Sequence, residues 1–147
     1  MASTTRTKVK NVPIPTVYCP TPTFQLFVAS GNQILEFDTA KEEFYHYCGD
    51  SASGYADGGR GDSKFSKITG LCLSADGDLV VADSGNHRIR KILKNGMVMT
   101  YAGTGKAGKE DGAIMSAQFN EPHGLCLLPN GDIAVADRGN NSIRIIS

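Results

Sequence analysis

Short apolar runs separated by turn-forming residues follow one another along this chain, which is typical of β-strands joined by hairpins. In residues 65–118 the expected strands are 70–73, 79–82, 88–93 and 97–102. The run Leu-Val-Val-Ala at 79–82 is wholly apolar, as in strands that are covered on both faces. No stretch places apolar residues at a 3.6-residue period over the length of a helix. The pattern therefore predicts an all-β chain made of four-stranded antiparallel meanders.

Pairs of turn-forming residues separate the expected strands. Asp76-Gly77 and Asn130-Gly131 lie between the first and second strands of two successive meanders. We expect type I′ hairpin turns there, with both central residues at positive φ. A third hairpin is expected at Asn95-Gly96.

The same pattern occurs at least twice. Residues 65–93 and 119–147 share 15 identities in 29 aligned positions, with Phe65 aligned to Phe119 and Ile92 aligned to Ile146. An internal duplication follows. The residues that recur and are assigned a structural role are Gly70, Asp83, Asn86, Gly124, Asp137 and Asn140.

A weaker third copy precedes the two clear ones. Ser30-Gly31-Asn32 lies one repeat length before Ser84-Gly85-Asn86, with Ala29 in the place of the aspartate. We expect a degenerate repeat at 24–64 and clear repeats at 65–118 and 119–147. Four prolines lie between residues 13 and 22. Residues 1–23 are therefore expected to form a Pro-rich, partly disordered leader.

The repeated motif resembles the NHL repeat. The matching segments are Gly70-Leu71, the Asp-Gly-Asp-Leu-Val-Val-Ala-Asp of 76–83, the Ser-Gly-Asn-His-Arg-Ile of 84–89, and the Tyr-Ala-Gly-Thr-Gly of 101–105. The resemblance implies β-propeller blades in a partial ring of about three, fewer than the six of a complete NHL propeller. It also implies a platform that binds protein or RNA, and some members are metal-dependent enzymes. A homodimer in which two chains of three blades complete a six-bladed ring is one expectation, and the alternative is that this chain is a fragment of a longer protein.

Charge and cysteine content narrow the class of partner and the compartment. Lys plus Arg and Asp plus Glu number 15 each, so the net charge is zero and no chain-wide attraction to nucleic acid or to an anionic membrane is expected. No membrane partner is expected either, because no run of 18 apolar residues exists. The four cysteines show no Cys-x-x-Cys spacing and are expected as free thiols. A cytoplasmic location is expected, the alternative being an organelle reached through the short basic, Ser/Thr-rich N-terminus.

Candidates for catalysis and metal binding are weak. Asp83 and Asp137 end a strand before a turn, where each is expected to accept backbone N–H bonds of the turn or to pair with Arg90 or Arg144. A carboxylate that recurs in every clear copy favours a structural role. His46, His87 and His123 occupy three different repeat positions, whereas zinc needs three or four converging ligands. No catalytic residue, metal or cofactor is predicted.

A binding scaffold that contacts a protein through its propeller loops is the expected function. The expected surface consists of the loops 50–64 and 104–118 and the turns 84–88 and 138–142, because loops carry recognition more often than strands do. The alternatives are an RNA-binding module and, with less support, part of a metal-dependent propeller enzyme. The candidate binding residues are His87, Arg88, Arg90, Lys91, Arg138 and Asn141.

Overall fold

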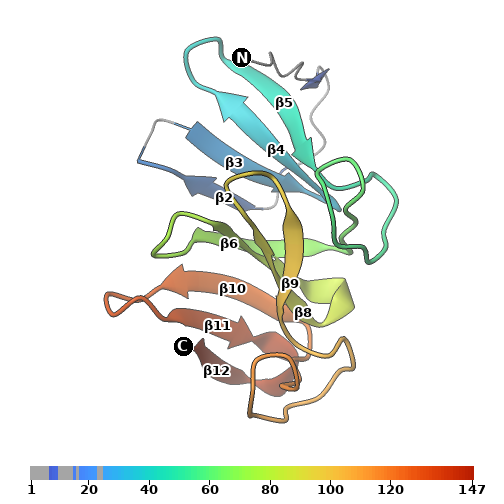
Figure 1. Ribbon diagram of the computed structural model, residues 1–147, viewed down its shortest axis with the longest axis vertical. Coiled ribbons are helices and arrows are strands. Elements are labelled where there is room, and N and C mark those ends of the chain that lie inside the picture. The colour runs from blue at the N-terminus through green and yellow to red at the C-terminus, as the bar shows by residue number, and fades with distance from the viewer. Residues whose placement is uncertain (1–6, 10–14, 16, 23–24) are drawn as a thin grey trace.

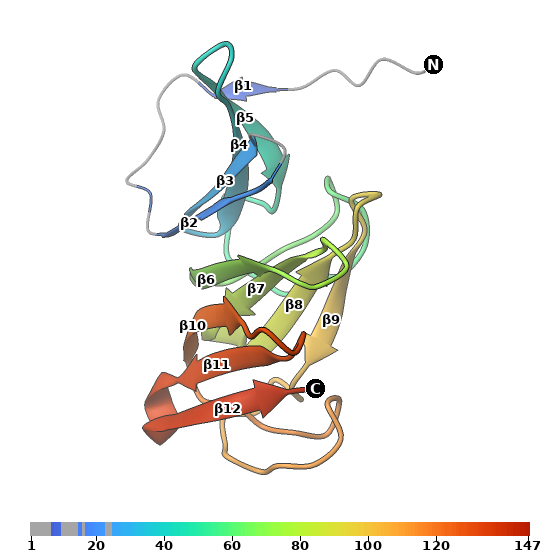
Figure 2. The same cartoon turned by 90° about the vertical axis from the view of Figure 1, so that its left-hand side faces the viewer.

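Three antiparallel sheets follow one another along the long axis of the chain (Figure 1). The computed structural model describes residues 7–9, 15, 17–22 and 25–147. Figure 2 shows that the sheets are stacked face to face like neighbouring blades. The first strands of the three sheets lie together, since β6 contacts both β2 and β10. The predicted all-β propeller architecture, a partial ring of three blades, is confirmed.

The first blade is a five-stranded sheet of order β1-β5-β4-β3-β2. Its strands are β1 (Lys8–Val9), β2 (Val17–Pro20), β3 (Gln25–Ser30), β4 (Gln33–Asp38) and β5 (Glu43–Cys48). Residues 1–23 were expected to form a leader, but two segments of them belong to the first blade. β2 is its innermost strand, and β1 pairs with the outer edge of β5. Pro20 ends β2 at a sheet edge, where a missing N–H is tolerated. The expected disorder concerns residues outside the described part.

The second and third blades are the two clear repeats. The second has the order β6-β7-β8-β9, with β6 (Ile68–Leu73), β7 (Leu79–Asp83), β8 (Arg88–Ile92) and β9 (Val98–Ala102). The third has β10 (Pro122–Leu127), β11 (Ile133–Asp137) and β12 (Ser142–Ile146), and β12 is its outermost strand in the described part of the chain.

The turns between the first two strands of these blades are not type I′. Gly77 and Gly131 have positive φ angles of 85° and 94°, but Asp76 and Asn130 do not. The Gly77 N–H donates to the carbonyl of Ser74, and the Ser74 N–H donates to the carbonyl of Asp78. This is a three-residue loop in which a left-handed glycine follows a type I turn. The expectation of two positive-φ residues was therefore wrong, because one glycine suffices for this longer loop.

The turns between the second and third strands contain short 3₁₀ helices, η1 (Ser84–Asn86) and η2 (Arg138–Asn140). Each helix ends on a left-handed residue, His87 or Asn141, at a φ of 51°. Asn tolerates this conformation better than most residues do. These two candidate binding residues therefore have a backbone role in the turn.

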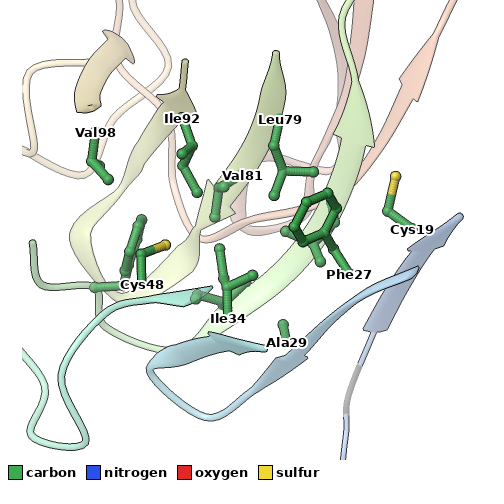
Figure 3. Close-up of a cluster of buried hydrophobic side chains, with 12 residues drawn as sticks. Cys19, Phe27, Ala29, Ile34, Cys48, Leu79, Val81, Ile92 and Val98 are labelled. Carbon is green, nitrogen blue, oxygen red and sulfur yellow. The ribbon is translucent and has the colours of Figure 1, made fainter. Parts of the chain in front are cut away.

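Two hydrophobic clusters lie between neighbouring blades. Figure 3 shows the first, in which Phe27 and Ile34 of the first blade meet Leu79, Val81 and Ile92 of the second. The second cluster joins blades two and three, and Phe119 and Val135 are among its most buried members. The apolar run at 79–82 faces both clusters, and all its side chains are buried. This agrees with a strand covered on both sides.

The first blade departs from the other two at its second turn. Ser30 pairs with Gln33 across this turn, whereas Asp83 pairs with Arg88 across the turn of the second blade. Two residues instead of four thus connect the strands, and Ser30, not Ala29, takes the place of the aspartate. By the same registers, Leu35 takes the place of Arg90. The first blade therefore lacks the aspartate–arginine pair of the second.

All four cysteines are free, and only Cys126 is exposed. Burial raises the pKa of both Cys48 and Cys72 to about 12. None of the helices in the described part of the chain is long and apolar enough to cross a membrane.

Gly70 and Gly124 occupy the same repeat position but face different surroundings, which provides a matched test of blade packing. A Cβ at Gly70 would overlap the backbone carbonyl oxygen of His123 in the next blade, whereas one at Gly124 would lie 3.9 Å from the Cβ of Ala136. Gly70→Ala is expected to destabilise the fold by about 1–3 kcal/mol through overpacking. Gly124→Ala is expected to change stability by less than about 0.5 kcal/mol. Urea denaturation of both variants measures this, and equal losses would contradict the packing of β6 against β10.

Candidate functional site

The repeated polar residues form a buried network in the second blade. Arg90 on β8 and Asp83 at the end of β7 are both fully buried, and their side chains form an ion pair with an N···O distance of 2.8 Å. Asn86 of η1 donates a hydrogen bond of 2.8 Å to the same carboxylate. The Ser66 backbone N–H donates to the other carboxylate oxygen at 2.8 Å. The expected pairing with arginine is thus confirmed, but the backbone donor comes from the segment before β6 rather than from the turn.

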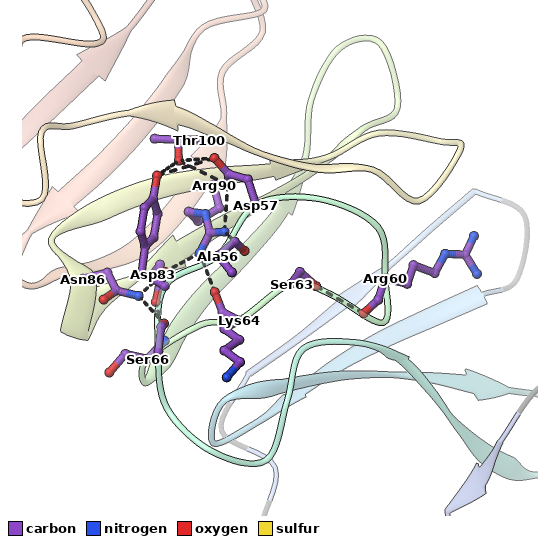
Figure 4. Close-up of polar contacts among 12 residues, drawn as sticks. Ala56, Asp57, Arg60, Ser63, Lys64, Ser66, Asp83, Asn86, Arg90 and Thr100 are labelled. Carbon is purple, nitrogen blue, oxygen red and sulfur yellow. Dashed lines mark hydrogen bonds and ion pairs between the residues drawn. The ribbon is translucent and has the colours of Figure 1, made fainter.

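The same network holds the long loop that enters the blade (Figure 4). The Arg90 guanidinium donates to the carbonyls of Lys64 and Ala56, at 2.8 and 2.7 Å, and to the Asp57 carboxylate at 2.8 Å. Asn86 donates to the carbonyl of Gly54 at 2.8 Å. The loop residues 54–66 are thereby fixed against the third strand of their own blade.

The third blade repeats these contacts position by position. Arg144 pairs with Asp137 at 2.8 Å and with Asp111 at 2.7 Å, and the Asn120 N–H donates to Asp137 at 2.8 Å. Asn140 donates to Asp137 and to the carbonyl of Gly108, both at 2.7 Å. Because this network recurs in each clear repeat, it is interpreted as a contact set that stabilises the blade and not as a reaction centre.

Burial of the carboxylate has an energetic cost. Burial raises the pKa of Asp83 above its usual value, although hydrogen bonds from Asn86, Ser66 and Arg90 act in the opposite direction. The arginine is also stacked over the Phe65 ring, 4.7 Å from its centroid. A buried pair of this kind specifies one arrangement, but losing one partner leaves an uncompensated charge in the interior.

Three of the candidate binding residues are engaged inside the propeller. Arg90 is fully buried and is not available to a partner. His87 accepts a hydrogen bond on Nδ1 from the backbone N–H of Glu121, 3.0 Å away in the segment before β10. Arg88 donates to the carbonyl of Thr104 at 2.8 Å and lies over the Tyr55 ring at 3.8 Å.

The other three candidates are more accessible. The Lys91 ammonium lies 4.2 Å from the centroid of Tyr101, on the side of the second blade. Arg138 and Asn141 are exposed and line a hollow of about 470 Å³ on the third blade, together with His123 and Ile143. The six candidates thus form no single site, and only Arg138 and Asn141 lie together on an open surface.

The outer edge of the third blade is a surface that the sequence analysis did not find. In the second blade, β9 pairs with β8 and also with the entering loop, through two hydrogen bonds between Val98 and Gly58 of 2.7 and 2.9 Å. The Thr100 hydroxyl donates to the Asp57 carboxylate at 3.0 Å and also contacts the Tyr55 hydroxyl. The fourth strand of this blade, β9, therefore lies between the edge of β8 on one side and the pair Asp57-Gly58 on the other.

The third blade has the same edge and the same aspartate–glycine pair, and none of the residues that the structure describes forms a strand between them. Asp111 and Gly112 correspond to Asp57 and Gly58, and the two glycines have φ angles of 134° and 127°. A hollow of about 550 Å³ lies between this pair and β12. The Asp111 side chain is 88% exposed, compared with 41% for Asp57. The Asp-Gly pair at 57–58 recurs at 111–112, and this recurrence was the sequence signal for the slot. It did not show that a strand covers the first pair but not the second.

Apolar side chains are exposed on the same blade. Ile143 and Ile145 on β12 are 69% and 52% exposed, whereas Ile89, the counterpart of Ile143 on β8, is fully buried. Leu127 at the end of β10 is also exposed. Among the described residues, no group of three or more His, Cys, Asp or Glu side chains is placed to hold a metal ion.

Comparison with known proteins identifies the repeat. The family model described as "NHL repeat" matches residues 65–92 and 119–146, the two clear copies. The Arabidopsis thaliana protein named "SUPPRESSOR OF QUENCHING 1, chloroplastic" is 45% identical over 78 residues, which are 52% of this chain and 7% of that protein. Human "NHL repeat-containing protein 2" is 41% identical over 68 residues, 46% of this chain and 9% of that protein. The match therefore spans less than a tenth of these relatives.

Solved structures show the same fold. An auxiliary nutrient binding protein from Bacteroides thetaiotaomicron superimposes with a TM-score of 0.78 at 24% identity, over 88% of this chain and 36% of that one. Virginiamycin B lyase from Staphylococcus aureus superimposes with a TM-score of 0.64 at 16% identity, over 97% of this chain and 42% of that one. At these identities the likeness concerns the fold alone.

Replacement of Arg90 tests the structural role of the network. Arg90→Leu leaves the Asp83 carboxylate buried without its cation and is expected to cost about 3–5 kcal/mol of unfolding free energy. Adding Asp83→Ser gives the Ser–Leu combination of the first blade and removes the uncompensated charge. The double variant is therefore expected to be more stable than Arg90→Leu alone, although the loop carbonyls remain unpaired.

Urea denaturation of the two single variants and the double variant measures this coupling. Additive losses, with the double variant the least stable, would contradict the account of Asp83 and Arg90 as one unit.

Proposed function

Because the chain contains two NHL repeats of the propeller type, we propose that it is a non-catalytic scaffold that binds another polypeptide. The observation that carries this proposal is the slot along β12, in which a backbone edge faces Asp111 and Gly112 and which no strand of the described residues occupies. We infer that an extended strand of the partner lies in this slot, pairs with β12, and adopts the position that β9 has in the second blade. Addition of a strand to a free sheet edge is a common mode of peptide recognition.

The second blade supplies a template for the partner's sequence. In β9, Val98 and Ala102 are buried, and Thr100 presents its hydroxyl to Asp57. Gly103 follows at a φ of 101°. The partner strand is therefore expected to carry an apolar residue, then a Thr or Ser two residues later and a small residue two residues after that. In this arrangement Asp111 accepts a hydrogen bond from the hydroxyl of the partner strand. Gly112 pairs with the backbone of the partner's apolar residue, as Gly58 pairs with Val98.

Charge supports a polypeptide more than RNA. The arginines Arg88, Arg90 and Arg144 are engaged with carbonyls and carboxylates of the propeller itself. Ile143 and Ile145 dominate the exposed side of β12, and RNA needs cations and stacking platforms at its contact surface instead.

Binding of a peptide with the sequence of residues 95–104 tests the proposal. Isothermal titration is expected to give saturable binding. Replacing the peptide threonine that corresponds to Thr100 by valine is expected to weaken binding roughly tenfold, since a hydrogen bond to a charged group contributes about 1.5 kcal/mol or more. Asp111→Asn in the chain is expected to weaken binding to a similar extent.

The matched control is Asp76→Asn, the same change at an exposed aspartate of the second blade. It is expected to leave peptide affinity unchanged. Absence of peptide binding, or saturable binding of random-sequence RNA in its place, would overturn the proposal.

A further inference from the structure

A recess of about 740 Å³ lies between the first and second blades, beside the hydrophobic cluster that joins them. Strands β3 and β5 form one wall, and the ends of β7 and β8 form the other. The volume lies within the range of small-molecule sites, about 300–1,000 Å³. The recess is a half-open cleft between two blades.

The interior of the recess is apolar. Phe27 comes from the first blade, and Leu79 and Ile92 come from the second; all three belong to the cluster shown in Figure 3. The Tyr47 ring packs edge-on against Phe27, with centroids 4.7 Å apart. Burial raises the pKa of the Tyr47 hydroxyl, against the opposing effect of Arg60. The floor therefore suits the apolar body of a ligand.

Two cations lie at the mouth of the recess. Arg60, at the tip of the entering loop, extends toward the first blade, and its guanidinium lies 4.4 Å from the Tyr47 ring centroid (Figure 4). Lys94 lies on the turn between β8 and β9, against Gly77. Among the described residues, neither has a carboxylate within ion-pair distance, whereas Lys8, Arg90 and Arg144 do.

Arg60 also departs from the repeat. Its counterpart in the next repeat is Ile114, whereas the fastening residues Arg90 and Asp83 recur as Arg144 and Asp137. Residues that recur serve every blade, so a cation that occurs once is not required by the blade. The Arg60 guanidinium stacks on the Tyr47 ring at the mouth of the recess, where it can also meet a ligand.

We propose that this recess binds an organic anion with an apolar body, the carboxylate at Arg60 and Lys94 and the hydrocarbon between Phe27 and Leu79. A carboxylate matches the fork of an arginine, and hydrogen bonds to charged groups are stronger than neutral ones. Glu36 on the opposite wall accepts a hydrogen bond of 3.0 Å from Gln25, so the recess also contains a negative group. The two cations outnumber it at the mouth, which favours a monoanion.

Titration of the ¹⁵N-labelled chain with octanoate tests the proposal. Saturable amide shifts are expected at Tyr47, Gly77 and Lys94 and in the loop around Arg60. 1-Octanol, which has the same length without the charge, is expected to bind at least about fivefold more weakly, since it forms no charge-assisted hydrogen bond.

The next repeat suggests which residue can replace Arg60 without disturbing the fold. Arg60→Ile carries the residue found at the same position in the next loop, so it is expected to fold and to lower octanoate affinity about tenfold. Lys94→Gln is expected to lower it less, because a lysine donates fewer oriented bonds. Arg138→Gln, which removes an exposed cation of the third blade, is the control and is expected to have no effect.

Several results would overturn the proposal. These are octanoate shifts confined to Ile143 and Ile145, equal affinities for octanoate and octanol, an unchanged affinity of a folded Arg60→Ile variant, or no saturable shift up to the solubility limit. The result is independent of the proposed function, because the peptide slot lies on the third blade and the recess lies between the first two.

Discussion

The buried pair of Asp83 and Arg90 holds together elements that the hydrophobic clusters alone would not orient. It joins the end of β7 to β8, and through Lys64, Ala56 and Asp57 it joins both strands to the loop that enters the blade. The backbone N–H of Ser66 completes the arrangement. Since the loop is fixed in this way, Asp57 and Gly58 can form one side of the groove in which β9 lies. The slot on the third blade follows from the same contacts made by Asp137 and Arg144.

The sequence was sufficient for the architecture because the repeat concerns packing. The regular spacing of the copies and the apolar run at 79–82 predicted the blades and the buried strand. The recurrence of Asp83 predicted a structural role, with either the turn or Arg90 as its partner. Turn geometry was harder to predict. An Asp-Gly pair is compatible with two kinds of hairpin loop, and their lengths differ by one residue. The shift of Ser30 into the position of the aspartate was also hidden, because the shorter turn places Ser30 53 residues before Asp83 and Leu35 55 residues before Arg90, on either side of the repeat length of 54.

The surfaces were the least predictable part. Candidate binding residues were chosen because they are cationic or lie in turns, and the same properties place Arg90 in the core and His87 between blades. The informative comparison is between equivalent positions. Ile89 and Ile143 occupy one repeat position, as do Asp57 and Asp111, but only the first of each pair is covered. Arg60 is informative for the opposite reason, since its counterpart is an isoleucine. Whether a side chain is buried, and whether its position departs from the repeat, depends on the neighbouring blade. The sequence of a single repeat does not contain this information.

Hydrogen exchange of the backbone amides of β8 and β12 is the most direct test of this account. The measurement uses the chain at a concentration where light scattering gives the mass of a monomer. Both strands are predicted to protect the amides that face the preceding strand, and the Ser66 and Asn120 amides are predicted to be protected because they donate to buried aspartates. The amides on the outer edge of β12 are predicted to exchange rapidly, unlike those of β8 that face β9. Equal protection of the two outer edges would contradict an open slot on the third blade.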